Sequence, residues 1–459
     1  MFSATKPLCR ADSITGKLLL NNKFRNEKQR SIDLRAKLTR MEIANKSHIA
    51  AVWQHATSRS LIDEHDTALL FQDLSIIADR YQRLVSAFPE ETLHAVAVKT
   101  NPLVPVLKHI QTLGAGMEAA SIPEVMLAQH AGTSLDKIVF DSPAKTEAEI
   151  RQLSESMPGV RINCDSLAEL SRFDKSGSSL RLGLRVNPLI SSDSIGYMNV
   201  GTSESKFGEP LSNREQIISE CLAHTSLDCL HVHLGSQFSD FAPTIRGIGL
   251  ILELANDINR LGKKKKIRTL NIGGGFPVNY HHDQQAFEIE HYVNALRNEL
   301  PRLFDGSYSL ITEFGRYVHA NAGWSMSRIE YVKPAGNSTN VITHLGADMF
   351  LRECYNPGDW YHEMFLLDAQ GNEKCGIPVA CNIAGPLCFG GDFIRRTVDL
   401  PEPSPGDWLA VQDTGANTFS LWSRHCSRQF PKVISCDGTN DIKIAKQRES
   451  IDSVIGFWS

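Results

Sequence analysis

The feature that most constrains the fold is a regular alternation of short apolar runs with longer amphipathic segments, from about residue 66 to about residue 325. Short apolar runs bounded by turn residues are typical of buried strands, and apolar residues spaced three and four apart are typical of helices. Eight runs are candidate strands: 94–99, 115–120, 137–141, 160–165, 181–187, 228–235, 268–273 and 308–314. Strands that alternate with helices in this way predict an α/β fold with a parallel sheet.

The segments between these runs carry helical periodicity. The predicted helices include Leu74–Phe88, Pro123–His130, Thr146–Ser154, Ile245–Leu261 and Ala286–Leu303. Strand and helix repeats of this number, over about 250 residues, match a TIM-type (β/α)8 barrel. A doubly wound open sheet is the alternative that we consider weaker.

After about residue 326 the helical periodicity fades, and Gly, Pro and Asp separate short β-rich pieces. These pieces are Val341–His344, Ile377–Asn382, Trp408–Gln412 and Lys432–Ser435. They predict a mostly β C-terminal domain. We therefore predict three parts: a basic extension over 1–65 that partly contributes to the β domain, a barrel over 66–325, and a β domain over 326–459.

Composition excludes several classes of protein. A net charge of −4 over 459 residues predicts affinity for neither nucleic acid nor membrane surfaces. No apolar run approaches the roughly 20 residues that span a bilayer. The ten cysteines form no CxxC pair, which favours reduced thiols in a cytoplasmic compartment and predicts no metal site.

Residues 1–41 differ from the rest because they are basic and poor in acids. The basic residues are Lys6, Arg10, Lys17, Lys23, Arg25, Lys28, Arg30, Arg35, Lys37 and Arg40, against Asp12, Glu27 and Asp33. An organelle transit segment has this charge pattern. We favour an ordinary basic extension, because serine is not abundant in this stretch.

Lys99 is the most unusual residue of the predicted strands, because it ends the buried run that begins at His94. Its ammonium must reach solvent, pair with an anion, or be held neutral. A lysine that loses its proton in a desolvated pocket is a nucleophile suited to Schiff-base chemistry. A strand-end lysine that simply extends to water is the ordinary alternative.

The ends of three later strands add chemistry that suits such a lysine, because functional groups in a barrel gather at the carboxyl ends of the strands. Gly273, Gly274 and Gly275 let backbone amides approach a phosphate, although a tight turn also explains them. Ser236 adds a hydroxyl. Glu313 is either a general base or the partner of a protonated ring nitrogen, and His233 is either a metal ligand or a flat platform. Together with Lys99 these groups describe a site for pyridoxal 5′-phosphate.

The motifs also resemble those of a known family, the fold-type III pyridoxal-phosphate decarboxylases, which include diaminopimelate, ornithine and arginine decarboxylases. The diaminopimelate branch is nearest. The motifs are AVKTNP around Lys99, RVNP at 185–188, SKFG at 205–208, HVHLGSQ at 231–237, NIGGGFP at 271–277, EFGR at 313–316, GPLCFGGD at 385–392 and DTGANTFSLWSR at 413–424. The resemblance covers about residues 66 to 435 and implies an amino-acid decarboxylase with a barrel followed by a β domain.

By this resemblance each motif has a role. Lys99 carries the cofactor, His233 stacks on its ring, and Glu313 pairs with its nitrogen. The phosphate is held by Ser236, by Gly273 to Gly275 and by Gly315. Cys388 is the acid, and it is supplied by the second subunit of a homodimer whose subunits share their active sites.

Three positions depart from the family pattern. The acid that usually follows the cysteine and contacts a distal ammonium is Phe389 here. The tyrosine that usually touches the phosphate is Asn417, which can still donate a hydrogen bond. A common Tyr-Asn pair is replaced by His425 and Cys426.

These departures bear on the substrate, because an aromatic ring cannot neutralise a buried ammonium. Arg316 remains, and Arg352 and Tyr355 lie where the family binds a distal carboxylate. We therefore expect a substrate that is not a free diamino acid, such as the citrate-conjugated diamino acids of carboxylate siderophore pathways. An alanine-racemase-like enzyme is disfavoured by the glycine loop, His233 and GPLC. A catalytically inactive regulatory homologue is disfavoured because Lys99 and Cys388 are both present.

Overall fold

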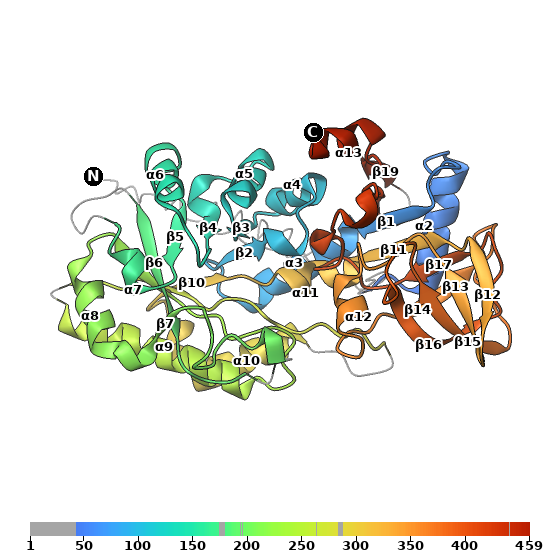
Figure 1. Ribbon diagram of the computed structural model, residues 1–459. Coiled ribbons are helices and arrows are strands. Elements are labelled where there is room, and N and C mark those ends of the chain that lie inside the picture. Colours follow the sequence, from blue (N-terminus) through green and yellow to red (C-terminus); the bar gives the residue numbers. More distant parts are fainter. Residues whose placement is uncertain are drawn as a thin grey trace, which may run out of the picture. The chain divides into compact units, whose positions relative to one another are not determined.

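The computed structural model describes residues 43–173, 180–192, 194, 196–262, 264–282, 288–439 and 441–459. The basic segment over 1–41 lies outside these residues. The described chain contains one closed parallel barrel and two further sheets (Figure 1).

The barrel consists of eight parallel strands. They are β2 (Leu93–Ala97), β3 (Gly116–Ala119), β4 (Ile138–Phe140), β5 (Arg161–Cys164), β6 (Arg181–Asn187), β8 (Leu227–His231), β9 (Thr269–Asn271) and β10 (Ser309–Thr312). The spatial order is β5-β4-β3-β2-β10-β9-β8-β6, and β5 also pairs with β6, so the sheet closes. A short strand, β7 (Glu209–Pro210), pairs with the end of β6. The predicted (β/α)8 barrel is therefore confirmed, and all eight predicted strands are present.

Helices precede or connect these strands. They are α3 (Leu74–Ala87), α4 (Val104–Thr112), α5 (Ile122–His130), α6 (Glu147–Ser156), α7 (Leu167–Leu170), α8 (Arg214–Ala223), α9 (Ala242–Leu261) and α10 (Ile289–Glu299). In Figure 1, α4, α5 and α6 lie on one side of the barrel strands, and α8, α9 and α10 lie on the other. Helix α6 starts at a capping box between Thr146 and Glu149, which satisfies two backbone amides.

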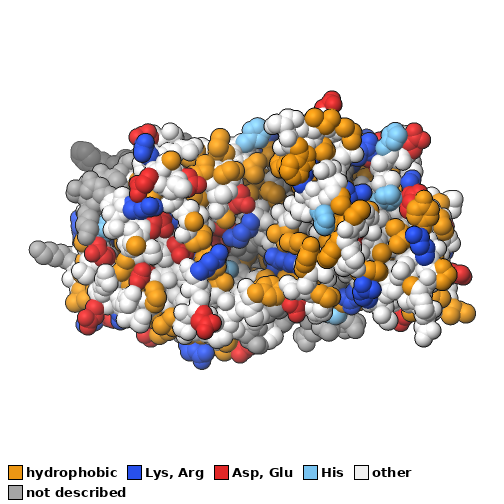
Figure 2. Space-filling model, in the orientation of Figure 1, with side chains coloured by type: hydrophobic (Ala, Val, Ile, Leu, Met, Phe, Trp, Pro, Cys, Tyr) orange, Lys and Arg blue, Asp and Glu red, His pale blue; other side chains and the backbone are white. Residues whose placement is uncertain are grey.

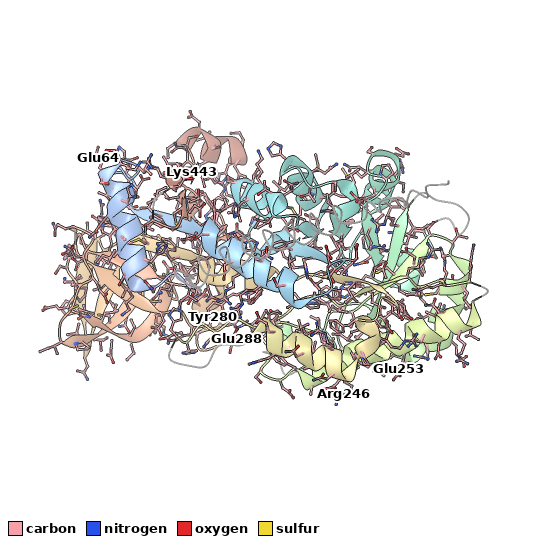
Figure 3. The ribbon with its side chains drawn as sticks, turned by 180° about the vertical axis from the view of Figure 1, so that it is seen from behind. Glu64, Arg246, Glu253, Tyr280, Glu288 and Lys443 are labelled. Carbon is pink, nitrogen blue, oxygen red and sulfur yellow. The ribbon has the colours of Figure 1, made fainter. Side chains whose placement is uncertain are left out.

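The longest of these helices shows why the periodicity was readable. Along α9 the buried residues include Ile245, Ile248, Leu252 and Ala255, spaced three and four apart. Arg246 and Glu253 project from its outer side (Figure 3). Burial of one apolar face thus holds the helix against the barrel.

The C-terminal β-rich part contains two sheets. The first has the order β14-β17-β11-β1-β18-β19, and the second β12-β13-β15-β16. The bounds are β1 (Ala68–Asp73), β11 (Gly323–Arg328), β12 (Tyr331–Ala335), β13 (Ser338–Ile342), β14 (Met364–Leu367), β15 (Pro378–Ala384), β16 (Phe393–Pro401), β17 (Trp408–Val411), β18 (Lys432–Asp437) and β19 (Asp441–Lys446). Short helices α11 (Gly315–His319) and α12 (Leu351–Tyr355) and a terminal helix α13 (Ile451–Trp458) complete this region. The mostly β character predicted for it is confirmed.

Strand β1 was not among the predicted strands, and it belongs to the six-stranded sheet. It pairs antiparallel with β11 and parallel with β18. It is buried along almost its whole length, so its sequence shows a buried strand without showing which strands flank it. The division into domains at residues 65 and 325 remains a prediction.

Helix α2 (Lys46–Ser58) contacts strands that are more than three hundred residues away in sequence. The rings of Trp53 and Trp408 lie 5.8 Å apart, and the Gln412 side chain donates a 2.7 Å hydrogen bond to the Ala44 carbonyl. Residues 43–65 therefore pack against the six-stranded sheet.

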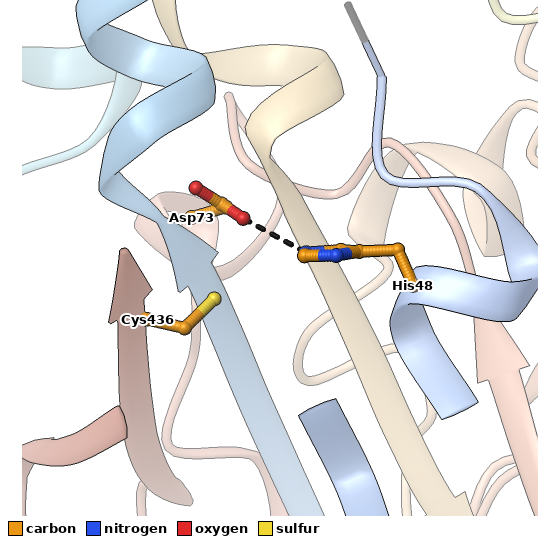
Figure 4. A group of neighbouring side chains, drawn as sticks. All are labelled: His48, Asp73 and Cys436. Atoms are coloured by element: carbon orange, nitrogen blue, oxygen red, sulfur yellow. Dashed lines mark hydrogen bonds and ion pairs between the residues drawn. The ribbon is translucent and has the colours of Figure 1, made fainter. Parts of the chain in front are cut away.

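A buried polar group joins α2, β1 and β18 (Figure 4). His48 Nε2 lies 2.8 Å from Asp73 Oδ2, and the other carboxylate oxygen of Asp73 accepts hydrogen bonds from the amides of Ser75 and Ile76 at the start of α3. Cys436 lies beside them and is also buried. Although burial favours the neutral acid, the hydrogen bonds from His48 and Ser75 hold the pKa of Asp73 below its usual value.

The surface matches the modest net charge. On the face drawn in Figure 2, acidic and basic side chains are interspersed with apolar ones, and neither sign of charge covers a large area. Among the described residues, no helix is both long enough and apolar enough to cross a membrane.

Candidate active site

The carboxyl ends of the barrel strands bring five polar residues together. Lys99 lies in a single helical turn, Val98–Thr100, directly after β2, and Glu118 lies within β3. His231 ends β8, Asn271 ends β9, and Glu313 follows β10. The predicted clustering at this end of the barrel follows from the parallel strands, whose carboxyl ends share one rim.

Lys99 forms an ion pair with the carboxylate of Glu118. Its Nζ lies 3.0 Å and 2.8 Å from the two oxygens of Glu118, whose side chain is fully buried, while 52% of the Lys99 side chain is exposed. The surrounding protein by itself lowers the pKa of Lys99, but Glu118 outweighs it and raises that pKa. Burial raises the pKa of Glu118 to about 7. The lysine is thus a cation whose nearest base is Glu118.

Glu313 is kept as a carboxylate by its neighbours. Asn271 donates a 2.7 Å hydrogen bond to its Oε1, and His231 Nε2 lies 3.6 Å from its Oε2. Burial alone would raise the pKa of Glu313, but His231 and Lys99 hold it below the usual range. The site therefore contains a fixed negative charge that can stabilise a protonated ring nitrogen.

His233 is a neutral, flat side chain that follows β8. The amide of Gly274 donates a 3.1 Å hydrogen bond to its Nδ1. Burial, with a further contribution from Arg185, lowers the pKa of His233 to about 3. The ring is therefore uncharged at neutral pH, and its orientation is fixed by the glycine loop.

The glycine loop after β9 lies against neighbouring backbone so closely that no side chain fits. A Cβ at Gly275 would lie 1.9 Å from the Gly235 carbonyl oxygen, and one at Gly274 would lie 2.4 Å from that of Glu313. Gly273 and Gly275 also have φ values of +68° and +93°. At Gly315, a Cβ would meet Thr100 at 2.6 Å. The lack of side chains lets a phosphate approach the backbone of this loop closely, while the amides of Gly273 and Gly274 donate hydrogen bonds to Asn271 Oδ1 and His233 Nδ1.

The two other predicted phosphate ligands lie on neighbouring segments. Ser236 Oγ accepts a 3.3 Å hydrogen bond from Arg316 Nε. Asn417 has a φ of +55°, and its amide donates a 3.0 Å hydrogen bond to the Thr100 carbonyl, next to Lys99. Asparagine tolerates this left-handed conformation better than most residues.

Two arginines share one aromatic ring beside this group. The guanidinium carbons of Arg316 and Arg352 lie 5.1 Å and 4.7 Å from the centre of the Trp360 ring. Arg316 also donates a 2.8 Å hydrogen bond to the Tyr280 hydroxyl, and Tyr280 lies in the segment that leads to α10, on the side of the β-rich strands (Figure 3). Burial lowers the pKa of Arg352 and Arg316 lowers it further, so the two cations repel each other.

The residue after the cysteine belongs to an aromatic group. The rings of Phe389 and Tyr355 are stacked at 5.3 Å and 15°, and the Phe389 ring lies 6.2 Å from that of His425. Cys388 is exposed in the turn between β15 and β16. The nearby Asp392 is not a substitute acid, since it is buried and accepts hydrogen bonds from the amides of Ala347 and Leu387.

Sequence reasoning missed several members of the site. Asp141 follows β4, and its carboxylate lies 3.5 Å from Arg185 and 3.8 Å from His231. A signal did exist for Glu118 and Asp141, because both are charged residues in or directly after predicted buried strands. None existed for Trp360, which lies outside the barrel strands.

Fold and site together define a class: (β/α)8 barrel proteins whose functional rim carries a lysine, a glycine loop and a buried glutamate. Comparison with known proteins agrees, because the family described as "Pyridoxal-dependent decarboxylase, pyridoxal binding domain" matches residues 74–320. The chain belongs to this family, and it is an amino-acid decarboxylase that uses pyridoxal 5′-phosphate.

Relatives match along most of the chain. The diaminopimelate decarboxylases of Aquifex aeolicus and Helicobacter pylori are each 27% identical, cover 86% of this chain, and are themselves covered over 93% and 96% of their lengths. A crystal structure of the Helicobacter pylori diaminopimelate decarboxylase complexed with L-lysine superposes with a TM-score of 0.78 at 24% identity. It covers 87% of this chain and 99% of its own, and it supports the fold.

Proposed function

We propose that the protein decarboxylates an α-amino acid whose distal end carries carboxylate and no free ammonium. Relatives named diaminopimelate decarboxylases support a substrate built on a diamino acid. The observation that carries the proposal is the pair Arg316 and Arg352 on the Trp360 ring, together with an aromatic side chain instead of an acid at position 389.

The cofactor would be held by residues already described. Lys99 would bind it covalently, Gly273 to Gly275 and Gly315 would line its phosphate together with Ser236 and Asn417, and the His233 ring would stack on its ring. When bound, pyridoxal phosphate supplies an electron-withdrawing ring that accepts the electron pair left when carbon dioxide departs. Glu313, kept charged by His231 and Lys99, would hold a proton on the ring nitrogen.

The distal end of the substrate is assigned from charge. Arg316 has only neutral partners among its described hydrogen bonds, the hydroxyls of Ser236 and Tyr280. Within the described residues, no carboxylate forms an ion pair with Arg316 or Arg352. Two buried or half-buried guanidinium groups without an internal counterion favour an anionic ligand, and a planar carboxylate fits the guanidinium fork.

The same reasoning disfavours a free second amine. Phe389, stacked on Tyr355, offers only a cation–π contact of roughly 0.5–2 kcal/mol, less than a carboxylate in a desolvated site. Glu353 follows Arg352 in the sequence, but its side chain is buried. Its carboxylate lies 2.9 Å from His362 Nε2 and is therefore already engaged. A second amine acylated by a polycarboxylic acid such as citrate would supply distal carboxylates for the arginines and would carry no free ammonium.

Cys388 is proposed as the acid that protonates the substrate carbon after decarboxylation. A thiol has a pKa near enough to neutrality for this task. Its exposure in the turn between β15 and β16 supports a position from which it completes the site of a second subunit in a homodimer.

The proposal is tested by measuring carbon dioxide release from a set of amino acids. We expect diamino acids acylated at the second amine by a di- or tricarboxylic acid to exceed free meso-diaminopimelate, lysine and ornithine by about 10²-fold or more in kcat/KM. Lys99→Ala should abolish release from all of them. Turnover of free meso-diaminopimelate by the wild type at around 10⁴ M⁻¹s⁻¹ would contradict the proposal.

A swap at position 389 supplies the matched variant. Phe389→Glu should raise activity on free diamino acids and lower it on the acylated substrate, because it restores a carboxylate next to Cys388. Phe389→Leu is the control, since it removes the ring without adding charge and should produce no such gain.

A further inference from the structure

A second arginine-rich cavity lies next to Trp360. It has a volume of about 590 Å³, and its walls include His281, Trp360, Tyr361, Phe393, Arg395 and Arg396. These residues come from the segment before α10, from the chain after α12 and from β16. None of our sequence-based predictions uses this cavity.

The cations of the cavity are held on aromatic rings. The rings of His281 and Tyr361 are stacked at 3.8 Å and 18°, and the Arg395 guanidinium lies 4.3 Å from the centre of the same Tyr361 ring. Groups this close to one ring centre cannot share a face, so Tyr361 lies between them. The Arg396 guanidinium lies 3.5 Å from the centre of the Phe393 ring. Stacking limits the freedom of both guanidinium groups before any ligand binds.

The cavity has an excess of positive charge. Arg395 donates one 3.4 Å hydrogen bond, to the Trp360 carbonyl, which leaves its other N–H groups available. Across the residues that the structure describes, neither Arg395 nor Arg396 forms an ion pair with a carboxylate. Glu353 is the acid among the lining residues, and His362 engages it. Two preorganised guanidinium groups without a counterion favour an oxyanion ligand.

Trp360 connects this cavity to the candidate active site. Its ring carries Arg316 and Arg352, and its carbonyl accepts the hydrogen bond from Arg395. Trp360 therefore has guanidinium groups both at its ring and at its carbonyl. A flexible ligand that carries several carboxylates matches these separate guanidinium groups better than one compact anion does.

We propose that this cavity is a subsite for the polycarboxylate arm of the substrate, with Arg395 and Arg396 as its specificity-determining residues. The assignment to the substrate rests on the proposed function, whereas the binding of a polycarboxylate to the cavity can be measured without turnover.

The test is isothermal titration calorimetry of the full-length holoenzyme with tricarballylate, which has three carboxylates and no amino group. Inorganic phosphate and acetate are titrated in parallel. We expect tricarballylate to bind, and Arg395→Gln and Arg396→Gln each to weaken binding by about 10-fold. Arg260→Gln, on the exposed side of α9, is the matched control and should bind like the wild type.

Equal tricarballylate affinity in the wild type and in a double Arg395→Gln, Arg396→Gln variant would overturn the proposal, as would absence of binding. Tighter binding of phosphate than of tricarballylate would also overturn it, since the cavity would then be a phosphate site. Thermal melting of each variant checks that it is folded. If free diaminopimelate proves to be the substrate while arginine-dependent tricarballylate binding persists, the proposed function fails and the polycarboxylate cavity remains.

Discussion

At the scale of single residues, the protonation of Lys99 is decided by Glu118. A lysine must be neutral to attack a carbonyl, yet Glu118 holds it as a cation by direct contact at 2.8 Å. Because the pKa of Glu118 is itself about 7, this carboxylate is also the nearest group that can take the proton. The pair therefore sets the pH at which the cofactor can attach.

We predict that Glu118→Gln shifts cofactor attachment to lower pH. Glu118 raises the pKa of Lys99, whereas desolvation lowers it. Without the Glu118 carboxylate the pKa of Lys99 should therefore fall. Visible absorbance of the reconstituted protein across a pH series measures the shift, with Glu299→Gln, an exposed change on α10, as the control. An unchanged or higher midpoint in Glu118→Gln would contradict this account of the pair.

At the scale of elements, the buried group of His48, Asp73 and Cys436 joins three segments that are distant in sequence. Asp73 caps α3 through the amides of Ser75 and Ile76 and pairs with His48 on α2. Removing one partner of a buried pair leaves an uncompensated charge, which is costly in a desolvated interior. The group thus helps to hold α2 against β1 and the start of α3.

We predict that His48→Ala lowers the free energy of unfolding at pH 7 by about 3–5 kcal/mol. Since the folded-state pKa of Asp73 is lowered, its contribution is complete above the usual aspartate pKa and is lost as the pH falls through the folded value. The difference between variant and wild type should therefore shrink in that acidic range. Urea unfolding at several pH values measures it. Lys46→Ala, which removes an exposed ion pair with Glu373, should cost about 1 kcal/mol or less.

At the scale of the whole molecule, the proposed sharing of the active site between two subunits concerns Lys99 and Cys388. Lys99 lies on the barrel, and Cys388 lies between two strands of the four-stranded sheet. If the site is shared between subunits, each chain contributes the lysine to one site and the cysteine to the other.

Mixing two inactive variants tests this arrangement. Combined Lys99→Ala and Cys388→Ala proteins should recover about a quarter of wild-type activity after random exchange of subunits, because each hybrid dimer contains one intact site. Native mass spectrometry establishes that exchange has occurred. Exchange without recovery would place both residues in one site of a single chain.

Much of the barrel was predictable because its signals are local. Each strand between Leu93 and Thr312 is a short apolar run, and the long helix α9 shows amphipathic periodicity, so all eight strands were found. Lys99, the glycines at 273–275 and Glu313 were found by the same logic, since position at the end of a parallel strand already places a side chain at the functional rim. These conclusions required no knowledge of which strands are neighbours.

Only the tertiary structure decided the contacts between segments that are far apart in the chain. The partners of β1 are set by packing across more than 250 residues, and a buried strand looks alike in either sheet. Glu118 and Lys99 are 19 residues apart in sequence. Trp360, in the segment between α12 and β14, stacks on the guanidinium of Arg316. A sequence by itself determined which residues are buried and where strands end, because burial and turns leave a local pattern. The pairing of charges and the stacking of arginines depend on distance in space, and no local pattern records that distance.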